Sequence, residues 1–123
     1  MSKALFVKTN TQKEWLNKLS VHEESFRSFS KEIDEKSRFP MENIKALVDM
    51  GYTKTTVPTE YGGEGHCVTD LVLLQETISS YDSSTGLAIG WHQSVVGELY
   101  ENKLWQEDKL LEFAKEISKG ALV

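Results

Sequence analysis

The residues of this chain that could do chemistry are three histidines, one cysteine and a glycine-rich string. His66 and Cys67 are adjacent, whereas His22 and His92 lie far from them in the sequence. Zinc sites pair their ligands at short spacings such as Cys-x-x-Cys or His-x-x-x-His, and no such pair occurs here. Cys67 has no evident base beside it, and no serine stands in a nucleophile elbow. The sequence therefore predicts neither a metal site nor catalytic residues.

The glycine-rich string is Tyr61-Gly62-Gly63-Glu64-Gly65. It lacks the spacing of a dinucleotide fingerprint and the Lys-Ser/Thr pair of a P-loop, and no clear strand precedes it. Glycine adopts positive φ angles at little cost. We therefore expect a tight, irregular turn here and not a phosphate cradle.

His92 lies between Ile89 and Val96 on the inner face of a helix expected over residues 85–101. Two interpretations remain open: a hydrogen-bonded core histidine, or a polar group that faces a ligand cavity. The same helix keeps three glycines, each of which costs about 1 kcal/mol relative to alanine. They are Gly86, Gly90 and Gly97. Such a helix usually needs the close approach of a neighbouring element or a ligand.

The first half of the chain predicts two helices. Residues 11–36 contain no Gly or Pro and are expected to form one long helix, capped by Asn10 or Thr11. Its apolar face recurs every three to four residues and comprises Trp15, Leu19, His22, Phe26, Phe29 and Ile33. Pro40 suits the first turn of a second helix, and Gly51 is expected to end it.

The second half predicts a loop followed by three helices. Residues 52–68 are rich in Gly and Thr and should form a loop, with an extended piece at 55–57. A helix then starts at Thr69 or Asp70, and its expected inner face comprises Leu71, Leu74, Gln75, Ile78 and Tyr81. Residues 105–119 form the last helix, before Gly120, with an inner face of Leu110, Leu111, Phe113, Ala114 and Ile117. The predicted fold class is an all-α, up-and-down bundle of about five to six helices with one Gly-rich loop.

Composition limits the classes of partner. The chain has 123 residues, a net charge of −5 and a sequence pI of about 5.2. An acidic protein is poorly suited to the phosphates of nucleic acids or to anionic membranes. One cysteine permits no internal disulfide, the apolar run within residues 1–8 is too short for a signal peptide, and no run could span a bilayer. We therefore expect a cytoplasmic protein.

Five motifs follow one another in a characteristic order. They are 33–35 (Ile-Asp-Glu), 39–40 with 44–52 (Phe-Pro, then Ile-x-x-Leu-x-x-Met-Gly-Tyr), 57–65 with Glu76, 82–86 with His92, and 106–109 followed by Gly120. This order, over residues 26–123, resembles the amino-terminal domain of acyl-CoA dehydrogenases. Departures at 53–54 and 103–105 indicate a divergent branch of that family.

The resemblance implies that residues 1–123 correspond to the amino-terminal helical domain of a longer oxidoreductase. In the family, a β-domain and a carboxy-terminal helical domain follow, and FAD lies between those two. The carboxylate that removes the α-proton, while a hydride passes from the β-carbon of the acyl-CoA to FAD, comes from the carboxy-terminal domain. We therefore expect this chain to bind no FAD and to be inactive alone.

The resemblance also implies a role in acyl-CoA binding. The helix over 85–101 would form one wall of the acyl pocket, lined by Ala88, Ile89, His92 and Val96. A flavin-dependent monooxygenase of the same fold is an alternative, because a polar His92 near the flavin would suit hydroxylation. A stand-alone helical interaction module is an alternative of a different class.

The amino-terminal domain of a longer enzyme should expose an apolar patch where the other domains dock. The predicted patch comprises Tyr52, Val57, Ile89 and Val96. Self-association through this patch is a further expectation, since burying it would contribute about 25 cal/mol per Å².

Overall fold

The computed structural model describes residues 7–123, which form six α-helices, two short 3-10 helices and no strand. In chain order the elements are α1 (Asn10–Val21), α2 (Glu23–Lys36), α3 (Met41–Asp49), η2 (Tyr52–Lys54), η3 (Thr59–Tyr61), α4 (Val68–Tyr81), α5 (Ser83–Glu101) and α6 (Glu107–Ser118). The all-α prediction is confirmed. Most of the segment on which the signal-peptide prediction rests, residues 1–6, lies outside the described residues.

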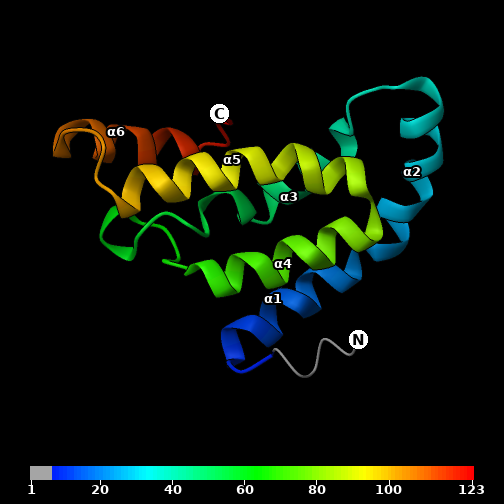
Figure 1. Cartoon of the computed structure of the whole chain (residues 1–123), viewed down its shortest axis with the longest axis horizontal. Coiled ribbons are helices and arrows are strands. Elements are labelled where there is room, and N and C mark those ends of the chain that lie inside the picture. Colours follow the sequence, from blue (N-terminus) through cyan, green and yellow to red (C-terminus); the bar gives the residue numbers. More distant parts are fainter. Residues whose placement is uncertain (1–6) are drawn as a thin grey trace.

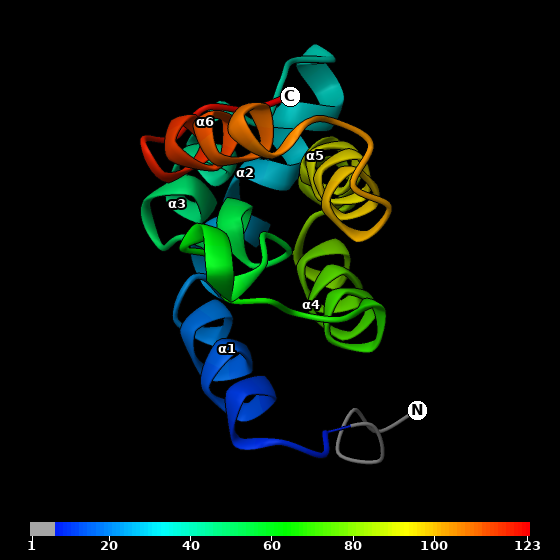
Figure 2. The same ribbon diagram turned by 90° about the vertical axis from the view of Figure 1, so that its left-hand side faces the viewer.

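A hairpin of α4 and α5 organises the molecule. These two helices pack on each other more extensively than any other pair, with only Asp82 between them. The other helices pack around the hairpin, with α1 along α4, and α3 and α6 toward α5 (Figures 1 and 2). Between residues 7 and 123, no helix combines the length and the hydropathy needed to cross a bilayer.

The single helix predicted over residues 11–36 is wrong, because the chain breaks at His22. There the backbone N–H donates to the Leu19 carbonyl at 3.0 Å, three residues back. No Gly or Pro marks the break, so tertiary packing must cause it. Helix α1 lies along α4, whereas α2 turns away, and its Phe26 ring meets Tyr81 at the end of α4, with ring centroids 6.4 Å apart (Figure 1).

The predicted cap of the first helix is also wrong. Thr9, and not Asn10 or Thr11, caps α1. The Gln12 N–H donates to Thr9 Oγ1 at 3.1 Å, and Gln12 Oε1 accepts the Thr9 N–H at 3.2 Å. This reciprocal pair satisfies two backbone donors at once.

Helix α4 starts earlier than expected, at Val68. The carboxylate of Asp70 accepts the backbone N–H of Cys67 at 3.4 Å, so Asp70 closes the first turn from inside the helix. The next helix, α5, starts at Ser83, where Asp82 accepts the Thr85 N–H at 3.0 Å. The prediction of a later start for each helix is therefore wrong by one or two residues.

The core divides into two clusters along α5. The first lies among all of the first five α-helices and comprises Trp15, Leu19, Phe26, Ile44, Leu47, Tyr52, Leu74, Ile78, Tyr81 and Ile89. The second joins the loop, the end of α5 and α6, and comprises Val57, Tyr61, Val96, Leu99, Tyr100, Leu110, Ala114 and Ile117. In α6 the predicted inner residue Leu111 is instead 44% exposed, and in α4 the predicted Leu71 and Gln75 are only half-buried.

The glycine-rich loop is a tight turn, as predicted. Gly62 and Gly65 have φ angles of +90° and +66°, a region that favours glycine. The segment 55–57 is not extended, because it enters a series of turns in which the Gly65 N–H donates to the Val57 carbonyl at 2.8 Å. Side chains then fix the loop from both sides: Trp15 Nε1 donates to Glu64 at 3.0 Å, and the Tyr61 hydroxyl donates to Glu107 at 2.7 Å.

Candidate functional site

The residues predicted to line an acyl pocket lie on the inner side of α5. Ile89, His92 and Val96 are at most 1% exposed, and Ala88 is half-buried against the first core cluster. All four therefore contact this domain's own core, and three of them are fully enclosed by it. Their contact with an acyl chain stays a prediction.

His92 is a hydrogen-bonded core residue. Its Nε2 lies 2.9 Å from the Thr53 carbonyl oxygen, and its Nδ1 accepts the backbone N–H of Val123 at 3.2 Å. This pairing requires a neutral ring that carries its proton on Nε2. Burial lowers the pKa of His92, and the hydrogen bond to Thr53 opposes that shift only in part.

Two of the three helix glycines allow α4 and α5 to approach each other. A Cβ at Gly86 would collide with the Ser79 side chain and come within 3.0 Å of the Ser79 Cα, which is backbone. A Cβ at Gly90 would lie 2.8 Å from Nε2 of Gln75. Gly97 is different, because its nearest neighbour would be Thr56 at 3.8 Å. A neighbouring helix, and not a ligand, therefore accounts for the glycines at 86 and 90.

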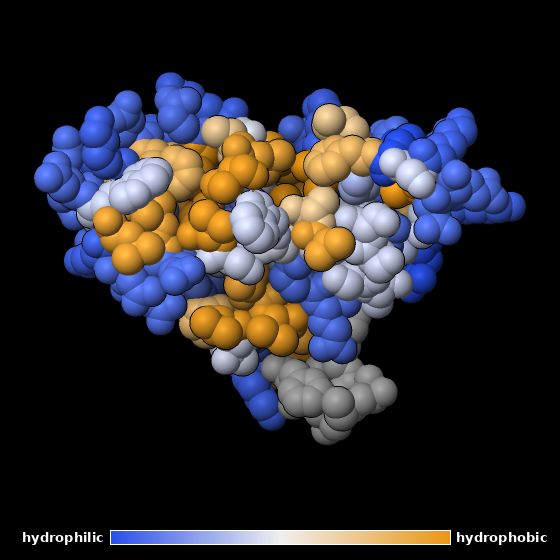
Figure 3. Space-filling view, turned by 45° about the horizontal axis from the view of Figure 1, so that its top comes forward, coloured by the Kyte–Doolittle hydropathy of each residue, from blue (hydrophilic) through white to orange (hydrophobic). Residues whose placement is uncertain are grey.

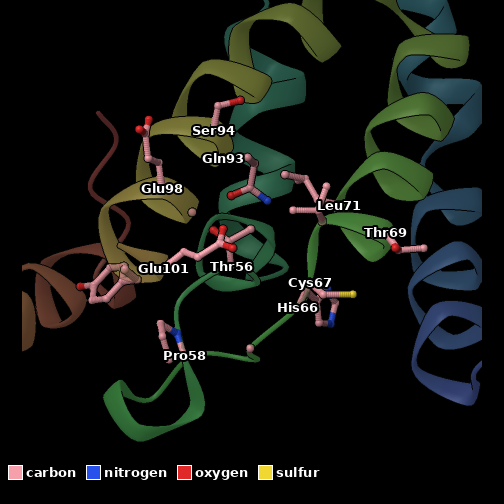
Figure 4. A pocket seen from close by; sticks show the side chains of 14 residues that line it. Thr56, Pro58, His66, Cys67, Thr69, Leu71, Gln93, Ser94, Glu98 and Glu101 are labelled. Carbon is pink, nitrogen blue, oxygen red and sulfur yellow. The ribbon is translucent and has the colours of Figure 1, made fainter. Parts of the chain in front are cut away.

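Gly97 lies in the wall of an open cleft of about 660 Å³. The loop, the first turns of α4 and the second half of α5 enclose it (Figure 4). Its lining residues are Thr56, Pro58, Gly65, His66, Cys67, Val68, Thr69, Leu71, Gln93, Ser94, Gly97, Glu98, Tyr100 and Glu101. His66 and Cys67 were considered for chemistry from the sequence, but their spacing gave no sign that they lie near α5.

Among the described residues, four buried polar atoms of the cleft lining have no hydrogen-bond partner: Gln93 Oε1, Thr56 Oγ1, and Nδ1 and Nε2 of His66. The Gln93 amide is held in place because its Nε2 donates to the Tyr52 carbonyl at 3.0 Å and to Thr55 Oγ1 at 2.9 Å. Gln93 and Thr56 were not identified from the sequence as candidate site residues. The available signal was the polar Gln93 beside His92 on the inward arc of α5.

The cleft offers no sign of a metal centre. His66 packs edge-on against Trp15, with ring centroids 6.1 Å apart, and its Nε2 lies 3.9 Å from Glu64. Cys67 is exposed beside Asp70. In the part of the chain that the structure describes, no three His, Cys, Asp or Glu side chains converge to hold a metal ion.

The predicted exposed patch is wrong. Tyr52, Val57, Ile89 and Val96 are at most 1% exposed, because the core clusters enclose them. The outer face of the α4–α5 hairpin carries exposed apolar side chains instead: Val68, Val72, Leu87 and Trp91, which are between 57% and 81% exposed. Figure 3 shows apolar side chains reaching the surface at several places on the face in view. We call these four residues the hairpin face.

The helical fold and the motif order together define a class of protein. Residues 10–104 match the family described as acyl-CoA dehydrogenase, N-terminal domain. The chain belongs to this family, and the elements from α1 to the end of α5 are the family's amino-terminal helical domain.

Several relatives are acyl-CoA dehydrogenases by name. The chain is 42% identical over 120 residues to the acyl-CoA dehydrogenase-like protein YdbM of Bacillus subtilis. The aligned region covers 98% of this chain and 32% of YdbM. It is 31% identical over 98 residues to a short-chain specific acyl-CoA dehydrogenase of Clostridium acetobutylicum, covering 80% of this chain and 26% of that enzyme. The chain thus spans a third or less of the relatives it matches. No solved structure matches it significantly.

The family implies FAD, and the cleft residues do not fit it. The diphosphate of FAD and the phosphates of coenzyme A are anionic and favour Arg or Lys. The cleft presents the carboxylates of Glu98 and Glu101 and, within the described part of the chain, no Arg or Lys. The first turn of α4, which could attract an anion, is already occupied by the carboxylate of Asp70. We therefore assign no flavin contact to the cleft.

Proposed function

We propose that this chain is the amino-terminal domain of an FAD-dependent acyl-CoA dehydrogenase that acts on acyl thioesters, and that it has no activity alone. The observation that carries the proposal is the hairpin face, in a chain that covers 32% of YdbM. Single exposed apolar residues are ordinary on a protein surface. Val68 and Val72 on α4, and Leu87 and Trp91 on α5, are instead spaced four residues apart, so each pair lies on one face of its helix, as expected of an interface.

In this proposal the hairpin face is covered by the rest of the enzyme, and α5 forms one wall of the acyl pocket. Ala88, which is half-buried, would meet the acyl chain first. Ile89, His92 and Val96 would lie behind it and keep the wall apolar and rigid, since all three are enclosed by the domain core. Small and apolar residues suit an acyl chain because they leave an apolar slot.

A chimera with YdbM tests the proposal. The 120 aligned residues of YdbM are replaced by this chain, and the purified chimera is assayed for bound flavin and for acyl-CoA-dependent reduction of an electron acceptor. The isolated chain is assayed in parallel. We expect activity from the chimera and none from the isolated chain.

A variant pair then tests the hairpin face. Trp91→Asp places a charge on the face and should abolish flavin retention and activity in the chimera while leaving the isolated chain folded, because Trp91 is 66% exposed. Val21→Asp is the matched control, since Val21 is 80% exposed at the end of α1. An active isolated chain, or a chimera that tolerates both changes equally, would overturn the proposal.

A further inference from the structure

The cleft wall holds unpaired oxygen atoms at Gln93 and Thr56, and an unpaired imidazole at His66 that supplies one donor and one acceptor when neutral. Gln93 Oε1 can only accept, and its amide is held by two donated bonds, so rotation cannot satisfy it. Thr56 Oγ1 is also buried without a partner, although Thr56 can accept as well as donate. Native proteins leave few buried polar atoms unpaired, and each such atom calls for an explanation, such as a bound ligand or an ordered water. The side chains of Gln93 and Thr56 lie together in the cleft wall (Figure 4).

The charge of the cleft indicates which charge a bound ligand should carry. Glu98 and Glu101 line it from the last turns of α5, and neither forms an ion pair in the part of the chain that the structure describes. Among residues 7–123, no Lys or Arg lines the cleft. A cation is therefore favoured and an anion is opposed, including the phosphates of coenzyme A.

The α4 side of the cleft is partly apolar. Val68, which also belongs to the hairpin face, and Leu71 line it beside the polar residues His66, Cys67 and Thr69, and Pro58 lines it from the loop. This wall suits the methylene stem of a ligand whose head reaches the polar wall. A water molecule could satisfy Gln93 and Thr56 but would make no use of the apolar wall or of the two carboxylates.

We propose that the cleft binds an organic cation, a guanidinium or alkylammonium group on a short apolar stem. A guanidinium carries five N–H donors and no acceptor, which matches a site that offers Gln93 Oε1, Thr56 Oγ1 and two carboxylates. The cation has two possible sources, a free small molecule or the side chain of an arginine presented by a polypeptide. The proposal is argued from the lining of the cleft alone and does not depend on the proposed function.

Titration of the full chain with butylguanidinium, followed by amide chemical shifts in NMR, tests this site. Butylurea is the matched neutral control, since it keeps the stem and most of the head but loses the charge. Saturable shifts confined to the cleft residues are expected with butylguanidinium. Butylurea is expected to bind at least fivefold more weakly, and butyrate is expected not to bind.

Three variants separate the contributions to binding. Thr56→Val removes a hydroxyl that has no partner, so the fold is retained, and affinity should fall roughly two- to tenfold. Glu101→Gln should weaken binding roughly two- to fivefold and cannot unfold the chain, because Glu101 is exposed. Glu112→Gln, an exposed residue of α6 outside the cleft, should leave the affinity unchanged.

A titration with an acetylated Gly-Arg-Gly amide distinguishes the two sources. If the peptide binds as tightly as butylguanidinium, the site accepts an arginine side chain from a polypeptide. If only the free cation binds, the site is for a small molecule. Equal shifts from butylguanidinium and butylurea, no saturable shift at the cleft, or unchanged affinity in both Thr56→Val and Glu101→Gln would overturn the proposal.

Discussion

Substituting Gly86 with alanine tests the account of the α4–α5 hairpin. At an open helix position this change should stabilise the protein by about 1 kcal/mol, since alanine has the higher helix propensity. At Gly86 the new Cβ would collide with the Ser79 side chain and come within 3.0 Å of the Ser79 Cα. A side chain could rotate away, but the Cα is backbone, so the two helices must separate.

The expected magnitude follows from two opposing contributions. Overpacking a close contact costs typically about 1–3 kcal/mol. The higher helix propensity of alanine offsets part of this overpacking cost. We therefore expect Gly86→Ala to lower the free energy of unfolding by roughly 1–2 kcal/mol. Gly97→Ala is the matched control in the same helix. Its Cβ would lie 3.8 Å from Thr56, an ordinary contact, so it should stabilise the chain by about 0.5–1 kcal/mol.

Urea unfolding, followed by far-UV circular dichroism, measures both variants. The opposite signs make the comparison independent of any general effect of alanine. If Gly86→Ala were as stable as Gly97→Ala, the close approach of the helices would not explain the glycine at position 86. Adding Ser79→Ala, which removes the hydroxyl facing Gly86, should recover part of the loss in the double variant.

Three further predictions concern single side chains. Thr9→Ala removes the cap of α1 and should lower the free energy of unfolding by about 1 kcal/mol in the same urea assay. Tyr61→Phe removes the hydrogen bond to Glu107. In the unsubstituted chain, that carboxylate and burial raise the pKa of Tyr61 to about 12. The contribution of Tyr61 to stability should be complete below pH 10 and fade as the pH rises toward 12, which an absorbance titration of tyrosine and unfolding curves at high pH would detect. His92 has its pKa lowered from 6.5 by burial, so the unfolded state takes up the proton first as the pH falls. Stability should therefore decrease below pH 6.5, by at most about 1.4 kcal/mol per pH unit, and His92→Gln should flatten this slope in unfolding curves measured between pH 7 and 5.

Helix periodicity predicted most of the fold, because burial of an apolar face is written directly in the spacing of residues. Trp15, Leu19, Phe26 and Ile33 are all buried, as their spacing indicated. The break at His22 could not be predicted, because the local sequence is compatible with a continuous helix. It depends on α4, which lies far away in the sequence and packs along α1 but meets α2 near its own end, at Tyr81.

Caps were predicted less well than helix faces. Thr9, Asn10 and Thr11 can all accept a backbone N–H, and the choice depends on Gln12, which closes the reciprocal pair with Thr9. The glycine-rich loop was predicted correctly because positive φ angles favour glycine whatever surrounds it. Its fixed position, by contrast, depends on the partners Glu64 and Glu107, which no local rule identifies.

The candidate site could be predicted only in part. The glycines of α5 indicated a close contact but not whether a helix or a ligand makes it. Gln93 and Thr56 come together because the loop folds back on α5, and 37-residue separations of this kind leave no local pattern. The apolar patch was predicted at residues that the core encloses, since periodicity identifies an apolar face but not which of two faces of a helix remains uncovered.

The most direct test of whether this chain is the amino-terminal domain of a longer enzyme is to read the coding DNA beyond the codon for Val123. If the account is right, the reading frame, or a frameshifted continuation of it, encodes a β-domain and a carboxy-terminal helical domain that supplies a carboxylate base. A stop codon followed by an unrelated gene would contradict it, and the chain would then be a helical module that functions without an acyl-CoA dehydrogenase around it.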